Sequence, residues 1–232
     1  MRKALCISDK AQQKKERAMV FTHSDVDGVT SLALLESVLF EKGLDVCHYI
    51  PHRVKEGYGL NKNIMNLVRQ RGIKVLITAD CGTNSDEEIK ALKKQGVQVI
   101  VTDHHEPSAH ESSEYACALI NPKAKESGYP YRDLAGVGVA YKFCQAVAGR
   151  SLEEELDLVS LGTIADAVPL TGENRIIAKE GLVKLTETKR PGLRMLIENS
   201  GLRNKKITPS LVSFILGPRI NASGRMDSAE IA

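Results

Sequence analysis

Residues 97–105 read VQVIVTDHH, a short apolar run that ends in Asp103, His104 and His105. Two earlier stretches have the same form: residues 74–82 read KVLITADCG, and residues 18–28 read AMVFTHSDVDG. Near-continuous Val and Ile runs of this length are typical of strands buried on both faces of a parallel sheet. The stretches therefore predict buried strands over residues 18–22, 74–78 and 97–102, each followed closely at its carboxyl end by acidic or imidazole groups.

The segments around these runs alternate between helical and strand patterns. The periodicity predicts helices over residues 29–39, 60–71 and 86–94, and two further strands over residues 45–50 and 118–120. Strands that alternate with helices build a parallel sheet with helices on its faces. We therefore expect an α/β fold with a Rossmann-like, mostly parallel sheet flanked by helices.

The second half of the chain has a different pattern. Beyond residues 121–122 only helical patterns occur, with breaks expected at Gly149, Pro191 and Pro209. We assign residues 1–150 to the α/β core and residues 151–232 to a helical part of the same domain that ends in the start of an inter-domain linker helix. The last six residues, 227–232, have the pattern of a new helix without a capping signal, so we expect further chain and a second domain that is absent here.

Composition restricts how the protein binds a partner. The 232 residues include no Trp and only 4% aromatic residues, so phosphate contacts are a more plausible means of binding nucleic acid than base stacking. The net charge of +3 is too small for a histone-like binder. The basic clusters at residues 14–17 and 203–206 are interpreted as solvated faces, with phosphate contact as the alternative.

The cysteines and the hydropathy indicate the compartment. Five widely spaced cysteines with no C-x-x-C pair suit neither a disulfide framework nor a zinc ribbon, and they indicate free thiols in a reducing cytosol. The N-terminus lacks the apolar region of a secretory signal, and no stretch reaches the roughly 20 apolar residues of a membrane span. The sequence predicts a cytoplasmic protein with no membrane partner.

The polar groups after the three strands are expected to meet. Neighbouring strands lie about 4.8 Å apart, and ligands bind open α/β sheets beyond the carboxyl ends of the strands. Each group has an ordinary explanation when taken alone, namely a turn, a helix cap or a surface histidine. Ordinary capping does not predict such groups at three strand ends together. Clustered carboxylates require cations, and the mixture of Asp and His favours manganese, with magnesium, cobalt or zinc as alternatives.

Asp166 is the one charged residue in the apolar stretch LGTIADAVPL, residues 161–170. A buried carboxylate without a partner is costly, so it needs a cation or hydrogen-bond donors nearby. A helix cap before Pro169 explains Asp166 equally well, and the sequence alone leaves both interpretations open.

These motifs, in this order, resemble those of the DHH phosphoesterase superfamily. The similarity extends over nearly the whole chain, and within the superfamily it is strongest to the RecJ-type single-strand exonucleases. Residues 50–61 (IPHRVKEGYGLN), 134–140 (LAGVGVA) and 217–225 (GPRINASGR) resemble further segments of that family. His23 is a departure, because bacterial RecJ proteins commonly have Asp there and archaeal relatives have His.

The resemblance implies a role for each residue of the motifs. His23, Asp25 and Asp80 would bind one cation, while Asp27, Asp80, His104 and Asp166 would bind a second, so that Asp80 bridges the two. As catalytic residues beside Asp80, His105 would face the scissile phosphate and Asp103 would orient an imidazole. Substrate phosphate would be bound by Arg219, Asn221 and Arg225.

The expected function is two-cation hydrolysis of single-stranded DNA to nucleotides, in DNA repair or recombination. Two divalent cations about 3.5 to 4 Å apart activate a water for in-line attack on phosphorus. Two alternatives remain: a DHH phosphodiesterase acting on short oligoribonucleotides, cyclic dinucleotides or pyrophosphate, and a non-catalytic replication or repair scaffold. A third reading, dinucleotide binding at Gly136-x-Gly138, is rejected because no convincing strand precedes this pair and the third glycine is missing. Tight helix packing explains the two glycines better.

Overall fold

The computed structural model describes residues 1–52, 56–57, 59–108 and 115–226, apart from the side chains of Arg225 and Met226. The helix expected from residue 227 lies outside the described residues. Among the described residues, none of the helices combines the length and the apolar character needed to cross a membrane.

Five parallel strands form one sheet in the order β2-β1-β3-β4-β5. The chain order reverses between β1 and β3, which makes their carboxyl ends the topological switch point of the sheet. The predicted α/β fold with a parallel sheet is confirmed. The strands are β1 (Ala18–Thr22), β2 (Val46–Tyr49), β3 (Val75–Ala79), β4 (Gln98–Thr102) and β5 (Ala118–Ile120).

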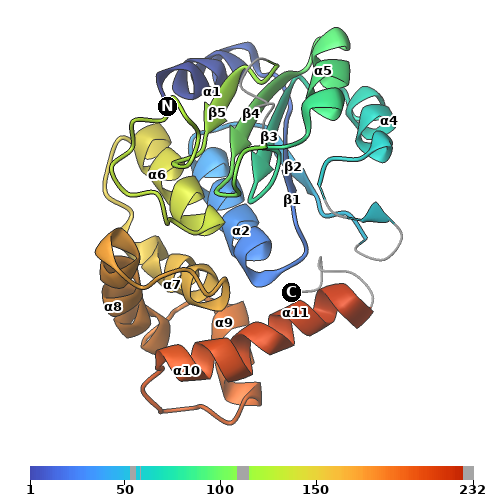
Figure 1. The fold of residues 1–232 in the computed structure, drawn as a ribbon. Coiled ribbons are helices and arrows are strands. Elements are labelled where there is room, and N and C mark those ends of the chain that lie inside the picture. The colour runs from blue at the N-terminus through green and yellow to red at the C-terminus, as the bar shows by residue number, and fades with distance from the viewer. Residues whose placement is uncertain (53–55, 58, 109–114, 227–232) are drawn as a thin grey trace.

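Helices cover both faces of the sheet, because alternate side chains of each strand point to opposite faces. Val20 and Ile77 belong to the apolar core beneath α1 (Arg2–Lys14), α2 (Val26–Glu41) and α6 (Gly136–Ala148). The other face, which includes Phe21 and Leu76, is covered by α4 (Lys62–Gln70) and α5 (Asp86–Lys94). This layering explains why the strands read as continuous apolar runs (Figure 1).

The helical half packs against the sheet domain through α2, whose Val26 belongs to the apolar core of that half. This core also contains residues of the helix that runs from Pro209 to Met226 and includes one π-helical segment. The elements are η2 (Glu153–Glu155), α7 (Leu156–Ala165), α8 (Gly172–Thr186), α9 (Pro191–Asn199), α10 (Pro209–Leu211), η3 (Val212–Leu216) and α11 (Gly217–Met226).

The expected breaks coincide with element ends. Gly149 ends α6 with a left-handed φ of 69°, while Pro191 and Pro209 occupy the first turns of α9 and α10. The structure differs from the sequence prediction at two helices. Residues 2–14 form a helix that was not predicted, and α2 begins at Val26 and not at residue 29. Asp27 therefore lies in the first turn of a helix, where α2 fixes its direction.

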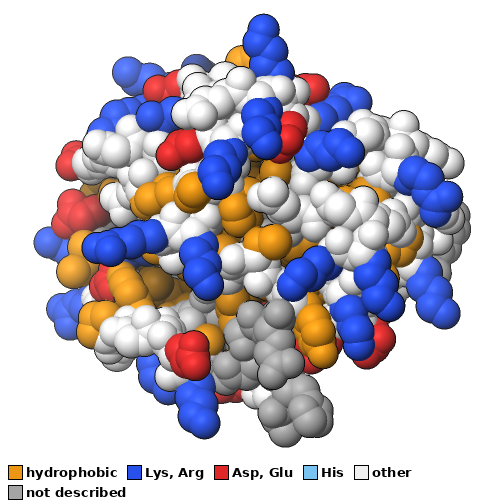
Figure 2. Space-filling model, turned by 90° about the horizontal axis from the view of Figure 1, so that it is seen from above, with side chains coloured by type: hydrophobic (Ala, Val, Ile, Leu, Met, Phe, Trp, Pro, Cys, Tyr) orange, Lys and Arg blue, Asp and Glu red, His pale blue; other side chains and the backbone are white. Residues whose placement is uncertain are grey.

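Figure 2 shows the face seen from above Figure 1, on which Lys and Arg side chains are scattered among uncharged and acidic ones. Two members of the basic cluster at residues 14–17 have acidic neighbours: Lys14 lies 3.9 Å from Glu16, and Arg17 lies 3.5 Å from Asp45. These exposed pairs fit the interpretation as a solvated face.

Candidate metal centre

Six of the predicted ligands converge beyond the carboxyl ends of β1, β3 and β4. Three of them lie just after these strands: His23 is the first residue after β1, Asp80 is the first after β3, and His104 is the second after β4. The other three come from helix ends: Asp25 is the N-cap of α2, Asp27 lies in its first turn, and Asp166 is the C-cap of α7. Neighbouring strands and helices thus bring together residues that are up to 143 positions apart in the sequence.

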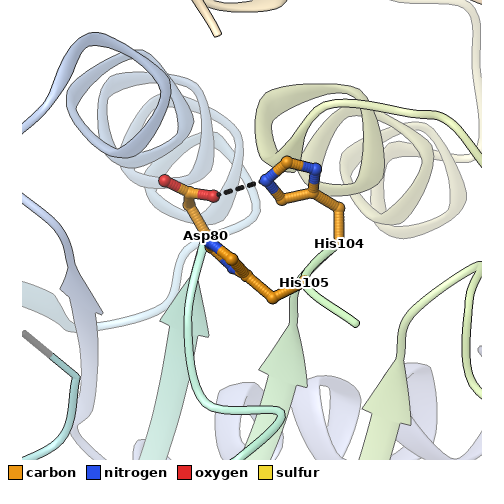
Figure 3. Close-up of side chains that lie close together, drawn as sticks. All are labelled: Asp80, His104 and His105. Atoms are coloured by element: carbon orange, nitrogen blue, oxygen red, sulfur yellow. Dashed lines mark ion pairs between the residues drawn. The ribbon is translucent and has the colours of Figure 1, made fainter. Parts of the chain in front are cut away.

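The ligand atoms form sets in which all atoms lie within 4.8 Å of one another. One set is His23, Asp25 and Asp80, and another is Asp27, His104 and Asp166. A third joins Asp80 to His104 and His105 (Figure 3). The first set contains the three residues that the family resemblance implied for one cation, and the second contains three of the four implied for the other, without Asp80. The assignment of these residues to two cations stays a prediction.

Asp80 faces both of the first two sets. Its Oδ2 lies 3.9 Å from His23 Nδ1, and its Oδ1 lies 3.2 Å from His104 Nε2. The same His104 nitrogen lies 3.7 Å from Asp166 Oδ2 and 3.8 Å from Asp27 Oδ2. The geometry therefore gives Asp80 one oxygen toward each group of ligands.

A strained turn directs Asp80 into the site. Asp80 has a φ of 57°, in the left-handed region that costs a non-glycine residue roughly 1 to 3 kcal/mol. Its N–H donates to Thr102 O at 3.0 Å, and Thr78 Oγ1 donates to Cys81 O at 2.6 Å. Gly82, with a φ of 107°, completes the turn where a Cβ would lie 2.7 Å from Thr78 Oγ1. The turn is thus held by β3 itself and by the neighbouring β4, which is why the strained conformation persists.

The N-terminus of α6 holds Asp27. The backbone N–H of Gly136 donates to Asp27 Oδ2 at 2.7 Å, and that of Val137 donates to Oδ1 at 2.8 Å. Free N–H groups at a helix start favour a negative charge. A Cβ on Gly136 would lie only 2.6 Å from Asp80 Oδ1 and 2.9 Å from Asp27 Oδ2. The absence of a side chain at residue 136 thus allows α6 to touch two ligands at once.

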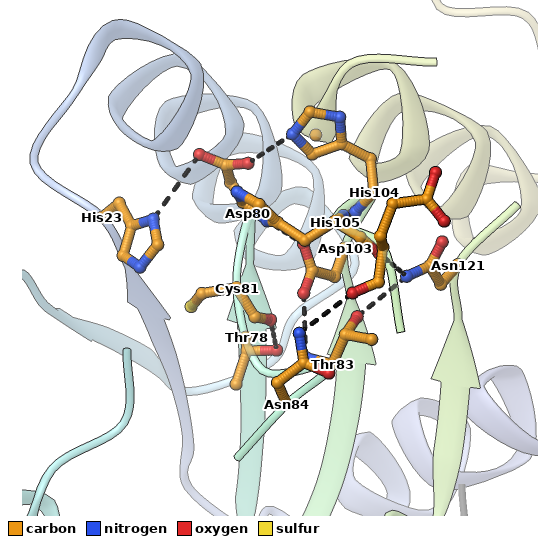
Figure 4. A network of polar contacts seen from close by, with 12 residues as sticks. His23, Thr78, Asp80, Cys81, Thr83, Asn84, Asp103, His104, His105 and Asn121 are labelled. Carbon is orange, nitrogen blue, oxygen red and sulfur yellow. Dashed lines mark hydrogen bonds and ion pairs between the residues drawn. The ribbon is translucent and has the colours of Figure 1, made fainter. Parts of the chain in front are cut away.

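Asp103 lies beneath the site and orients His105. His105 Nδ1 donates to Asp103 Oδ1 at 2.7 Å, and the Thr83 N–H donates to Oδ2 at 2.8 Å. Asn121 Nδ2 donates to both Thr83 Oγ1 and His105 O, so the loop is also tied to β5 (Figure 4). Because Nδ1 is engaged, Nε2 is the remaining ring nitrogen of His105.

Burial and mutual repulsion dominate the electrostatics of the carboxylates. Burial, and then the charge of Asp166, raises the pKa of Asp27 well above its usual range. Burial, and then the charge of Asp27, does the same to the pKa of Asp80. Burial and the charge of Asp25 raise the pKa of Asp166 to about 6. The carboxylates resist joint ionisation in the absence of cations.

The imidazoles and Asp103 behave differently. Burial and the charge of His105 lower the pKa of His104 to about 4, so its ring is neutral near pH 7. Hydrogen bonding to Asp103 raises the pKa of His105. Burial pushes the pKa of Asp103 upward, but its hydrogen bonds with His105 and Thr83 outweigh burial and lower it. Asp103 therefore stays ionised, whereas the carboxyl groups of Asp27, Asp80 and Asp166 do not all ionise together.

The residues fit a pair of divalent cations. Asp80 Oδ1 and Asp166 Oδ2 are buried, and no described residue donates a hydrogen bond to either oxygen. Ligands about 2.0 to 2.3 Å from one cation lie roughly 3 to 4 Å apart, which is the range of the separations around His104 and Asp80. No cysteine belongs to the sets, which is unlike a structural zinc site.

The predicted phosphate-binding residues are less clustered. Asn221 Oδ1 accepts a hydrogen bond from Val26 N at 3.1 Å, beside the ligands of α2. Arg219 Nη1 donates to Ile215 O, and its side chain lines a groove of about 490 Å³ between α2, α9 and α11. The side chain of Arg225 lies outside the described residues.

Sequence reasoning missed several groups that shape the site. The backbone N–H of Gly59 donates to His23 Nε2 at 3.2 Å, and the positive charge of Lys123 contributes to lowering the pKa of both His104 and Asp166. Gly162 lies so close to Asp27 that a Cβ there would be 3.2 Å from Asp27 Oδ1 and 2.3 Å from Thr30 Oγ1. Backbone amides and missing side chains leave no residue-type signal in the sequence, although residues 134–140 around Gly136 resemble a segment of RecJ-type proteins.

Known proteins resemble this chain in sequence and in fold. Single-stranded-DNA-specific exonuclease RecJ of Bacillus subtilis is 42% identical over 222 residues, which are 96% of this chain and 28% of that protein. A crystal structure of exonuclease RecJ bound to manganese superposes with a TM-score of 0.88 at 34% identity, over 99% of this chain and 58% of that one. RecJ of Thermus thermophilus in complex with Mn²⁺ gives a TM-score of 0.82 at 31% identity, over 99% and 33%.

The chain thus spans between about a quarter and three fifths of the length of these relatives. Residues 17–163 match the N-terminal domain of the DHH family, a range that includes every ligand described above except Asp166. The motifs, the strand order and this match agree, and the chain belongs to the DHH family.

Proposed function

We propose that this chain is the cation-binding part of an exonuclease that hydrolyses single-stranded DNA with two divalent cations, manganese being favoured. The observation that carries the proposal is the position of Asp80, with one oxygen toward His23 and the other toward His104. The names of the relatives and their manganese complexes support the substrate and the metal. Five free cysteines and a role in DNA repair or recombination fit a cytoplasmic protein.

The candidate ligands fall into two groups, one for each cation. His23, Asp25 and Asp80 would hold one cation, and Asp27, Asp80, His104 and Asp166 the other. Such a pair, when bound, lowers the pKa of a shared water and neutralises charge that develops on the phosphoryl oxygens. The Gly136 and Val137 amides keep Asp27 fixed, so that ligand does not have to reorganise.

His105 would act on the substrate itself. Its Nδ1 proton is shared with Asp103, and this contact stabilises the protonated ring. A protonated His105 would donate from Nε2 to a phosphate oxygen beside Asp80 and His104. Asp103 would keep the ring oriented, in the manner of the carboxylate partners of other site histidines. Arg219, Asn221 and Arg225 are proposed to contact phosphates from α11.

A substrate series tests the proposal. We expect manganese-dependent release of nucleotides from a 5′-labelled DNA strand of about 20 residues, and no release with excess chelator. RNA of the same sequence, a dinucleotide and pyrophosphate complete the series. If the dinucleotide or pyrophosphate is hydrolysed faster than the DNA strand, the proposed polynucleotide substrate is wrong and a small substrate takes its place. Manganese and DNA binding without any hydrolysis would indicate the scaffold alternative.

A further inference from the structure

Helix α11 reaches the centre of the cation site through one side chain. Asn221 Oδ1 accepts a hydrogen bond from the backbone N–H of Val26 at 3.1 Å, across 195 positions of sequence. Val26 stands between Asp25 and Asp27, and the sets that would hold the two cations each contain one of these carboxylates. The contact therefore lies where both ligand sets share one short piece of backbone.

The Val26 N–H needs such a partner. It is among the first N–H groups of α2, which have no acceptor within the helix. The neighbouring groups are satisfied locally, because Gly28 N donates to Asp25 Oδ1 at 2.9 Å and Val29 N donates to Asp25 O at 2.9 Å. Asn221 thus supplies from another helix the one acceptor that the Asp25–Gly28 turn does not provide for Val26.

Close packing keeps α11 in register with the ligands. A Cβ on Gly217, at the start of α11, would lie 3.4 Å from Ala165 Cβ and 3.9 Å from Val26 Cγ2. Ala165 immediately precedes Asp166, so this one surface of α11 meets the backbone beside three of the ligands. Ile220 adds to the contact, since it is buried in the same apolar core as Val26.

We propose that Asn221 is a positioning residue of the cation site: its Oδ1 fixes the turn that carries Asp25 and Asp27. This role differs from the phosphate contact expected from sequence, because the acceptor half of the amide is already engaged. No described residue accepts a hydrogen bond from its Nδ2 group, which stays available to a substrate phosphate. The inference rests on the proposed two-cation function.

Three variants of the whole 232-residue chain separate positioning from phosphate binding. Asn221→Ala removes both the acceptor and the donor. Asn221→Asp keeps an acceptor for Val26 N–H but replaces the donor by a negative charge. Ser223→Ala is the matched control, since Ser223 lies on the same helix and its hydroxyl bonds only to Ile220 O among the described residues. Manganese binding is measured by calorimetry on chelator-treated protein, and KM and kcat are measured on labelled single-stranded DNA.

We expect Asn221→Ala to weaken manganese binding about 10-fold and to lower kcat, as loss of a partner behind a metal ligand does. Asn221→Asp should bind manganese within about 3-fold of wild type and show its defect in KM, through repulsion of phosphate. Ser223→Ala should match wild type in all three values. Unchanged manganese affinity in Asn221→Ala, or an equal loss in Asn221→Asp, would overturn the inference.

A fourth variant and the wild type distinguish loss of the Asn221 contact from misfolding and from failure of the proposed function. If Asn221→Ala does not fold, as judged by thermal unfolding, Asn221→Leu keeps the side-chain volume without the acceptor and must show the same loss of manganese affinity. A wild-type chain that binds no manganese would overturn the proposed function and this inference together. A wild-type chain that binds two ions, with all variants equal to it, would overturn the inference alone.

Discussion

Gly136→Ala should damage the cation site although residue 136 is not a ligand. The added methyl carbon would lie 2.6 Å from Asp80 Oδ1, 2.8 Å from Asp80 Cβ and 2.9 Å from Asp27 Oδ2, where ordinary contacts begin at 3.4 Å. None of these atoms is the end of a long flexible side chain. Overpacking of this kind costs about 1 to 3 kcal/mol in folding stability.

The added methyl group would also weaken cation binding, because the atoms that it displaces belong to Asp80 and Asp27. Asp80 directs one oxygen toward His23 and the other toward His104, and Asp27 would lose its hydrogen bonds with the Gly136 and Val137 amides if α6 moved away. Disturbed partners of metal ligands typically reduce affinity by about 10- to 100-fold. We therefore expect manganese affinity to fall by about that factor and hydrolysis at limiting manganese to fall with it.

Gly138→Ala, on the same helix, is the matched control. Its Cβ would meet Leu134 Cδ2 at 3.2 Å, which is the end of a flexible side chain. Alanine in a helix is more stable than glycine by about 0.5 to 1 kcal/mol, so this variant should retain its stability and its manganese affinity. Calorimetry, thermal unfolding and a labelled single-strand assay measure all three quantities. Manganese binding by Gly136→Ala within about 3-fold of wild type would refute the reasoning.

Three further outcomes are expected. Asp80→Ala should reduce manganese-dependent hydrolysis to below a few per cent while circular dichroism stays unchanged, because its two oxygens face His23 and His104 on the two sides of the proposed cation pair; substantial residual activity would contradict the bridging role. The unfolding temperature of the chelated protein should fall as pH rises from about 4 to 7, and saturating manganese should remove this trend. The folded state holds protons on Asp27, Asp80 and Asp166 that the unfolded chain releases, and the raised pKa of His105 acts in the same direction. The lowered pKa values of His104 and Asp103 act in the opposite direction, so two groups of the site oppose four. A stability that rises over this range would be inconsistent with the crowded carboxylates. Arg219→Ala should weaken DNA binding and reduce the slope of log affinity against log salt by about 1, and identical salt titrations would remove Arg219 from the phosphate contacts.

Strands β1, β3 and β4 were readable because burial on both faces demands apolar residues at nearly every position, whereas the edge strands β2 and β5 are only partly buried. All five strands were predicted to within one residue, and five of the six candidate ligands were identified from their places just after the first, third and fourth strands. Asp166 was ambiguous in the sequence. In the structure Asp166 is the C-cap residue of α7, and its Oδ2 lies 3.7 Å from His104 Nε2 with no hydrogen-bond donor among the described residues. Its binding of a cation stays a prediction.

The sequence by itself determined the layered α/β architecture and the acidic and imidazole groups at the ends of its strands, because residue type, period and position after a strand are local properties. Only the tertiary structure decided which oxygen of Asp80 faces which ligands, that the α6 amides hold Asp27, and that Asn221 meets Val26. These contacts join backbone groups and small residues far apart in the chain. Every residue type supplies the same N–H group, so their positions become defined only when the helices pack.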